Sequence, residues 1–269
     1  ITNPFIISPK KTKQILNNFE KILPKVIIFS INSPGGTVSA SNNLYNIIKS
    51  FKKRNNVEII FHTNELLASG GYWAATAADK IYANYGAIIG SIGVKGPEWF
   101  FYDHPKTIST GIFGNTIETE KGIKIYSKKA GKSKDLFNPF RKPNIEELNH
   151  LQNMVDEIYN DFIRIVAKER KIESNALIDE IGALIYTSKK ARKLFLIDDE
   201  INLENLIDKI VKKNNFKNFK VIKNNYQKNS LLREIFAVNI DKNKKNINAE
   251  CLILKSSIAS ILSYQSVGC

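Results

Sequence analysis

Apolar residues at the start of the chain alternate between helical and strand-like patterns. Between Ile15 and Leu23 they recur every three or four positions, which predicts an amphipathic helix that ends at Pro24. Val26–Phe29 is a continuous apolar run, which is typical of a strand buried on both faces. The polar loop Asn32–Gly36 ends this strand, so the chain opens with a helix and a buried strand.

The next two elements complete a βαβ unit. Apolar residues between Ala40 and Phe51 mark one face of a second helix, and Val57–Phe61 predicts the following strand. A crossover of this kind is right-handed and joins two parallel strands. The pattern therefore predicts an α/β fold with a mostly parallel sheet.

The rest of the chain continues this alternation as far as Lys213. We therefore expect an α/β domain over residues 1–213 and a basic C-terminal extension of unknown role, with one helix, over residues 214–269. Residues 95–133 contain several Gly and Pro residues and are expected to be irregular, with one strand. The expected elements are an alanine-rich helix to about Ala78, strands at Lys80–Ala83, Ala87–Val94, Ile123–Tyr126 and Leu184–Tyr186, a long helix from about Asn144, and helices at Ser174–Ile181, Ser188–Leu194, Asn202–Lys213 and Ser230–Phe236.

Composition narrows the possible partners. With 43% hydrophobic and 25% charged residues, the chain can form a core and is not an intrinsically disordered protein. The net charge is +14, but the lysines are scattered and no nucleic-acid-binding motif accompanies them, so we expect no nucleic-acid partner. Weak attraction to an anionic membrane surface is compatible with this charge.

The sequence predicts no membrane-spanning helix, no metal site and no disulfide framework. The longest apolar stretches fall short of the roughly 20 residues that span a bilayer. Because the chain starts at Ile1 rather than Met, this leaves open an anchor upstream. Cys251 and Cys269 lie near the C-terminus, and the three histidines are far apart, so no metal site and no disulfide framework is expected.

Ser69 is the first candidate for chemistry. It lies between a predicted strand and a predicted helix and is followed by two glycines. From position alone, its ordinary role is to cap the helix. The loop Ser33–Gly36 ends a preceding strand, and although Pro-Gly commonly forms a simple tight turn, two such loops could supply backbone N–H donors to one developing oxyanion. The two loops together favour a catalytic serine.

A serine nucleophile needs a base. His62 is close in sequence, but it lies on a strand and no third residue is evident to orient it. A free lysine has a pKa near 10.4 and is neutral only about once in 10³ molecules at pH 7, although burial lowers that pKa. The residues alone do not select one lysine from the 40 basic side chains.

Several ordered motifs resemble peptidase family S49, the family of signal peptide peptidase A, over roughly residues 24–213. The resemblance implies a ClpP/crotonase-like fold of repeated β-β-α and βαβ units, with a helical C-terminal extension in this chain. The motifs are Asn32–Ser41, Ala68–Lys80, Gly90–Val94, Ala130–Asp135, Pro139–Arg141 and Leu196–Asp198.

The family's roles carry over to matching positions of this sequence. The resemblance implies Ser69 as nucleophile and Lys134 as general base, with Ser91 holding the lysine amine. It implies the backbone N–H groups of Gly36 and Gly70 as oxyanion donors. Lys132 is a rival for the base at a position where the family varies in residue type.

The resemblance also implies a setting for the activity. It implies a serine endopeptidase that needs no cofactor and forms a ring-like homo-oligomer. Its substrates would be hydrophobic peptides, such as remnant signal peptides, at the bacterial cytoplasmic membrane. The alternatives are a soluble cytoplasmic location and a role as a phage capsid-maturation protease. Two competing functions on the same fold are a non-catalytic S49-like assembly subunit and a crotonase-type acyl-CoA enzyme. The run Trp99–Tyr102 departs from the simplest family members, and we expect it to pack within the protein rather than to line a substrate groove or an oligomer contact.

Overall fold

The computed structural model describes residues 9–102, 109–111, 114–116, 129–225 and 251–256. The chain divides into two compact units, one formed by residues 1–93 and 161–269 and the other by residues 94–160. The boundary at residue 160 falls within the long helix α4 (Ile145–Arg170). The two units are described separately below.

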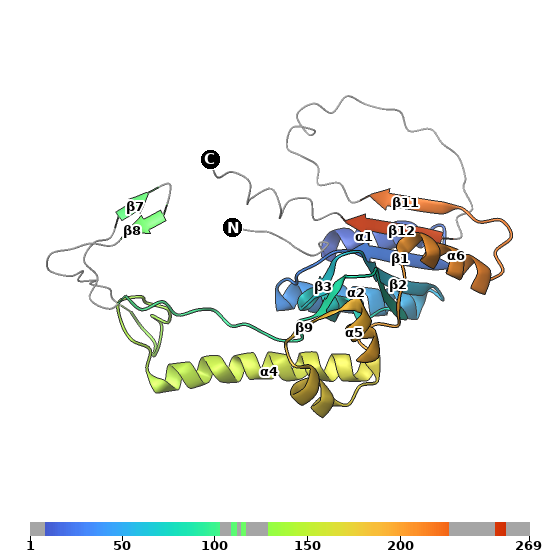
Figure 1. Ribbon diagram of the computed structural model, residues 1–269. Helices are drawn as coiled ribbons and strands as arrows, with labels where there is room; N and C mark the ends of the chain where they lie inside the picture. Colours follow the sequence, from blue (N-terminus) through green and yellow to red (C-terminus); the bar gives the residue numbers. More distant parts are fainter. Residues whose placement is uncertain (1–8, 103–108, 112–113, 117–128, 226–250, 257–269) are drawn as a thin grey trace, which may run out of the picture. The chain divides into compact units, whose positions relative to one another are not determined.

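A six-stranded sheet forms the centre of the first unit (Figure 1). Its strand order is β10-β4-β2-β1-β12-β11, and every pairing within it is parallel. The predicted α/β class with a mostly parallel sheet is therefore confirmed. The strands are β1 (Val26–Ile31), β2 (Glu58–Thr63), β4 (Lys80–Ala83), β10 (Asp199–Glu200), β11 (Val221–Asn225) and β12 (Cys251–Ser256).

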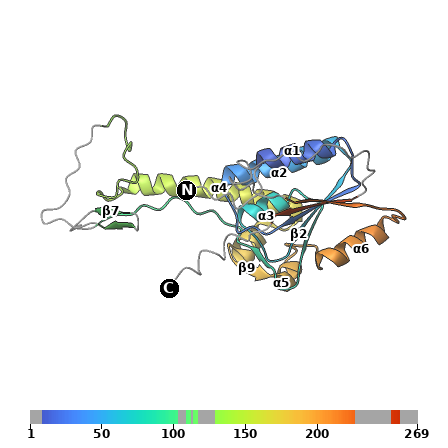
Figure 2. The ribbon, with the colours of Figure 1, turned by 90° about the horizontal axis from the view of Figure 1, so that it is seen from above.

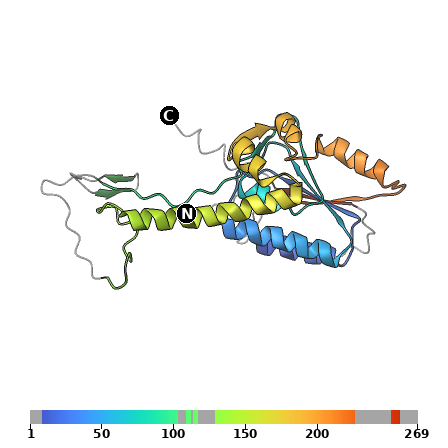
Figure 3. The same ribbon diagram turned by 90° about the horizontal axis from the view of Figure 1, so that it is seen from below.

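Helices cover both faces of this sheet. Figure 2 shows α1 (Pro9–Phe19) and α2 (Val38–Arg54) on one side and α6 (Leu203–Lys213) on the other, and Figure 3 gives the opposite view. Because alternate residues of a strand point to opposite faces, a strand that is apolar at every position supplies core side chains to both faces of the sheet. Val26 and Ile28 pack with Leu206 and Ile210 of α6, which forms the core on that side.

A smaller sheet positions the candidate chemistry. Its order is β3-β5-β9, with β3 (Leu66–Ala68) parallel to β5 (Ile88–Gly90) and β5 antiparallel to β9 (Ile185–Thr187). A single bridge between Ser33 and Leu67 joins the loop after β1 to this sheet. The short helices α3 (Gly70–Ala75) and α5 (Ser188–Lys193) follow β3 and β9 directly.

The second unit contains a hairpin, a compact turn and the start of α4. The hairpin pairs β7 (Ser109–Gly111) with β8 (Gly114–Thr116). The turn occupies residues 131–137, and α4 begins at Ile145 after an Asn144 side chain accepts a hydrogen bond from the Glu147 N–H. This cap explains the start of the long helix that the sequence predicted there.

Several expected boundaries were wrong. The first helix ends at Phe19 rather than near Leu23, because residues 20–22 form a turn and Leu23 has a φ of 39°, which lies outside the helical region. The strand expected over Ala87–Val94 ends at Gly90, where positive φ angles begin. Residues 176–181 form a π-helical turn, η1 (Ala176–Ile181), rather than an α-helix.

The described part of the C-terminal extension contains two strands that the sequence analysis did not predict. Its described parts, β11 and β12, are strands of the main sheet, and β12 pairs with β1. The helix expected at 230–236 and the strand expected at 123–126 lie outside the described residues. The proposed domain boundary at Lys213 stays a prediction, with strands from both sides of it in one sheet.

Candidate active site

Ser69 lies at a sharp strand-to-helix turn. It follows β3 and precedes α3, and its backbone has φ 51° and ψ −129°, a region that side-chain-bearing residues rarely adopt. Its N–H donates to the Gly90 carbonyl at 2.9 Å, and its own carbonyl accepts from the Trp73 N–H at 2.9 Å. These contacts on both sides hold the residue in a strained conformation, which is common at functional sites.

The Ser69 hydroxyl does not have the ordinary capping role. No hydrogen bond joins it to the first turn of α3, although Ser69 occupies the cap position. The side chain is half-buried. Of the two roles that the sequence allowed, capping is therefore wrong, and the hydroxyl remains available for chemistry.

The glycine loop after β1 lies directly against Ser69. Gly35 has a φ of 134°, and a Cβ placed on it would come within 2.9 Å of the Ser69 Cβ and 3.2 Å of its Oγ. A Cβ on Gly70 would come within 3.2 Å of the Gly36 backbone nitrogen and 2.1 Å of the Ser41 Oγ. The two glycine loops thus meet beside Ser69, as the sequence predicted, and only glycine permits this approach.

Hydrogen bonds attach this loop to the strand that carries Ser69. The Ser33 N–H donates to the Leu66 carbonyl at 2.6 Å, and the Ala68 N–H donates to the Ser33 carbonyl at 2.9 Å. Ser33 is fully buried. Gly35 is the residue that the sequence analysis missed. The glycine pair at 35–36 was the available signal, but the need for a positive φ at Gly35 is visible only in the structure.

Ser91 lies next to Ser69 through strand pairing. Ala68 pairs with Gly90 in the parallel register of β3 and β5, so the residues that follow each strand are neighbours. Ser91 is half-buried, has a φ of 52° and donates its N–H to the Leu184 carbonyl at 2.7 Å. Its expected role of holding a lysine amine stays a prediction.

Lys134 belongs to the second unit. It lies in the turn at 131–137 and is exposed in the single chain. Within the part of the chain that the structure describes, Lys134 forms no salt bridge, whereas Lys132 forms an ion pair with Glu146. This hydrogen-bonded pair raises the pKa of Lys132. Because a base must lose its proton, the pairing disfavours Lys132 as the rival base, and the partnership of Lys134 with Ser69 stays a prediction.

His62 is not placed to act as a base for Ser69. It is fully buried on β2, and its Nε2 lies 3.0 Å from the Ile201 carbonyl oxygen. Burial lowers the pKa of His62, and the hydrogen bond to the Ile201 carbonyl offsets part of this shift. A neutral histidine in the main sheet has a structural role.

The aromatic run at 99–102 packs within the second unit. The Trp99 Nε1–H donates to the Asn138 carbonyl at 3.1 Å, and the Tyr102 ring lies 5.8 Å from that of Phe140. Lys142 lies over the ring of Phe101. Trp99 and Phe101 therefore have the packing role that the sequence analysis favoured, whereas Phe100 is 62% exposed and Tyr102 40% exposed.

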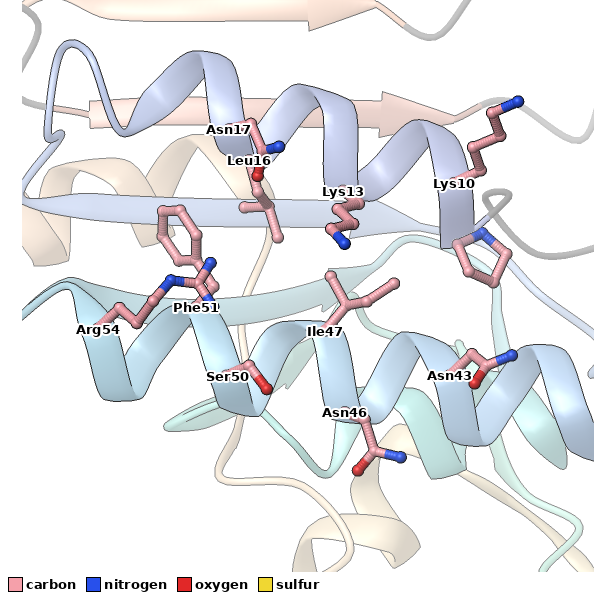
Figure 4. Close-up of a pocket in the computed structure, with 11 residues that line it drawn as sticks. Lys10, Lys13, Leu16, Asn17, Asn43, Asn46, Ile47, Ser50, Phe51 and Arg54 are labelled. Atoms are coloured by element: carbon pink, nitrogen blue, oxygen red, sulfur yellow. The ribbon is translucent and has the colours of Figure 1, made fainter.

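Other features of the described residues lie away from Ser69. A cavity of about 400 Å³ opens between α1 and α2, lined by Lys10, Lys13, Asn43 and Ile47 among others, and no candidate catalytic residue lines it (Figure 4). Among the described residues, no cluster of His, Cys, Asp and Glu side chains could hold a metal ion. No helix in the described ranges combines the length and apolar character needed to cross a membrane.

Comparison with known proteins identifies the family. The model of Peptidase family S49 matches residues 52–217, which is more than half of the chain. This chain belongs to peptidase family S49. The match includes Ser69, Ser91 and Lys134, so the resemblance in the sequence motifs is confirmed at the level of the family.

Curated relatives agree with this S49 assignment. The chain is 31% identical over 205 residues, 76% of its length, to "Putative protease MJ0651" of Methanocaldococcus jannaschii. It is 30% identical over 190 residues, 70% of its length, to "Putative signal peptide peptidase SppA" of Enterococcus faecium. It is 28% identical over 189 residues, 63% of its length, to "Protease 4" of Haemophilus influenzae. The matches span 61%, 51% and 28% of these relatives, so the chain corresponds to only part of each.

Proposed function

We propose that this S49 family member is a serine endopeptidase that uses Ser69 as nucleophile and Lys134 as general base. The observation that carries the proposal is the position of Ser69. Its hydroxyl does not cap α3, and it faces a loop so close that a Cβ added to Gly35 would come within 3.2 Å of the Ser69 Oγ. Serine peptidases need such a free hydroxyl beside closely approaching backbone donors.

The reaction is acyl transfer. The neutral amine of Lys134 accepts the Ser69 proton while the Ser69 oxygen attacks the scissile carbonyl carbon. The backbone N–H groups of Gly36 and Gly70 donate to the resulting oxyanion. The lysine ammonium then gives its proton to the leaving amine as the C–N bond breaks, which leaves an acyl ester on Ser69. Water, deprotonated by the same lysine, hydrolyses this ester and restores the serine.

This role requires that Lys134 be sheltered from water. The side chain is exposed in the single chain, whereas a general base must be able to give up its proton. We propose that assembly into a homo-oligomer shelters the amine and that Ser91 holds it by a hydrogen bond. Burial of the amine would lower its pKa and raise the neutral fraction.

The substrates are proposed to be hydrophobic peptides. The name of the Enterococcus faecium relative refers to signal peptides, which are apolar segments, and this supports remnant signal peptides as one substrate class. Such peptides would bind in an extended form through main-chain hydrogen bonds to a strand edge. Association with the bacterial cytoplasmic membrane belongs to the same proposal.

The test is hydrolysis of an internally quenched hydrophobic peptide by the full chain and by single variants. Ser69→Ala and Lys134→Ala should each abolish hydrolysis while circular dichroism shows an intact fold. Lys132→Ala is the matched control, because it removes a neighbouring lysine that is already paired, and it should retain activity. Full activity in Lys134→Ala would show that another group is the base, and full activity in Ser69→Ala would refute the nucleophile.

A further inference from the structure

We propose that Arg141 is a positioning residue that fixes the turn carrying Lys134, a role that rests on the proposed function. The inference starts from the turn itself. Within residues 131–137, three residues have positive φ angles: Gly131 at 94°, Ser133 at 57° and Phe137 at 64°. Two of these carry side chains, and such residues adopt this region only when their surroundings impose it. The turn therefore needs an external support.

Arg141 supplies this support through Asp135, the residue that follows Lys134. Its Nε and one terminal nitrogen donate to the two carboxylate oxygens of Asp135 at 2.9 Å and 3.0 Å. The same terminal nitrogen also contacts the Asp135 backbone carbonyl at 3.4 Å. A two-pronged contact of this kind fixes orientation as well as distance, because the guanidinium is planar and rigid.

A second edge of the guanidinium, which shares one terminal nitrogen with the first, binds the start of α4. The two terminal nitrogens of Arg141 donate to the two carboxylate oxygens of Glu147 at 2.8 Å and 2.7 Å. Glu147 is only 4% exposed and also accepts from the Asn144 N–H, so it is a rigid anchor in the helix cap. Trp99 covers the guanidinium, with its ring centre 5.0 Å from the Arg141 Cζ.

Arg141 thus connects residues 131–137 to the start of α4 through two bidentate contacts, here called forks, one with Asp135 and one with Glu147. Its donors are all directed at Asp135, Glu147 and the adjacent backbone, and this leaves the neighbouring Lys134 side chain outside the network. A base must be held within a fraction of an ångström of its productive position, and a misplacement of about 1 Å can cost about 100-fold in rate. The two contacts of Arg141 have the geometry needed to hold the backbone on which Lys134 lies in one position.

The test compares kcat and KM for hydrolysis of an internally quenched hydrophobic peptide. Arg141→Ala should lower kcat by about 10- to 100-fold, with KM nearly unchanged, because the base moves while the substrate contacts remain. Arg141→Lys should recover only part of the loss, since one ammonium cannot form both forks. Added guanidinium ion at low millimolar concentration should restore part of the kcat of Arg141→Ala.

Asp135→Asn keeps the experiment informative if Arg141→Ala fails to fold. It weakens the contact of Arg141 with the turn, together with the Lys129–Asp135 ion pair, and leaves the Arg141–Glu147 pair in place, so kcat should fall while the melting temperature changes little. Arg54→Ala is the matched control, because it removes an arginine that pairs with Glu20 in the other unit, and it should not change kcat.

The two proposals fail in different ways. If Ser69→Ala and Lys134→Ala are inactive but Arg141→Ala and Asp135→Asn keep wild-type kcat, the positioning role is refuted and the peptidase mechanism stands. A fall in kcat for Arg141→Ala that matches an equal fall in folded protein, with no recovery by guanidinium, would also refute it. If Lys134→Ala is fully active, the proposed function itself is wrong.

Discussion

Replacing Gly35 with alanine tests whether the glycine loop shapes the nucleophile. Gly35 has a φ of 134°, and an added Cβ would lie 2.9 Å from the Ser69 Cβ. The unfavourable backbone costs about 1–3 kcal/mol and the steric conflict about 1–3 kcal/mol, so the free energy of unfolding should fall by roughly 2–6 kcal/mol. Because the conflict is with Ser69 itself, the remaining folded protein should also have a displaced hydroxyl and a large loss of activity.

Gly86→Ala is the matched control for this substitution. Gly86 also has a positive φ, 78°, but a Cβ on it would meet nothing within 4 Å. It should cost only the backbone term, about 1–2 kcal/mol, and leave activity per folded molecule unchanged. Urea denaturation gives the stabilities, and peptide hydrolysis gives the activity. Wild-type activity in folded Gly35→Ala, or an equal loss in Gly86→Ala, would refute the argument.

Three further outcomes follow from other contacts. His62→Gln should keep peptide hydrolysis comparable to the wild type, and loss of activity in the folded variant would show that the buried histidine has a catalytic part. Tyr72→Phe removes a 2.7 Å hydrogen bond to the Leu196 carbonyl and should lower the free energy of unfolding in urea by about 1–2 kcal/mol, whereas no change would contradict the contact. The hydrogen bonds from Arg141 lower the pKa of Glu147 from 4.5 to about 2, so this carboxylate stabilises the fold above pH 4.5 and loses that effect as the pH falls through about 2. Thermal unfolding at constant ionic strength should therefore show a shallower acid loss in Glu147→Gln, and an identical loss would contradict the assignment.

The layered α/β fold could be predicted because its burial pattern is strong. A continuous apolar run predicted β1, a mainly apolar run predicted β2, and helical spacing predicted α2 and α4. Strands of two or three residues, such as β3 and β10, are too short to produce a period. The pairing of β12 with β1 joins segments far apart in the sequence, and local pattern does not specify such a partner.

The site could be predicted only in part. The glycine loops pointed to Ser69, and the structure places Gly35, Gly36 and Gly70 around it. The choice of Lys134 came from the resemblance to family S49, because a lysine's usefulness as a base depends on shelter that no local pattern reveals. The double fork of Arg141 was not foreseen, since it depends on side-chain geometry between a turn and a helix cap.

Labelling with a fluorophosphonate probe at several pH values tests the Ser69–Lys134 pair most directly. Peptide mapping by mass spectrometry should find the probe on Ser69 in the full chain. The labelling rate should rise with pH as the lysine loses its proton, and Lys134→Ala should label far more slowly while Lys132→Ala labels like the wild type. A Lys134→Ala variant that labels at the wild-type rate, or an unlabelled Ser69 in folded wild-type protein, would contradict the account.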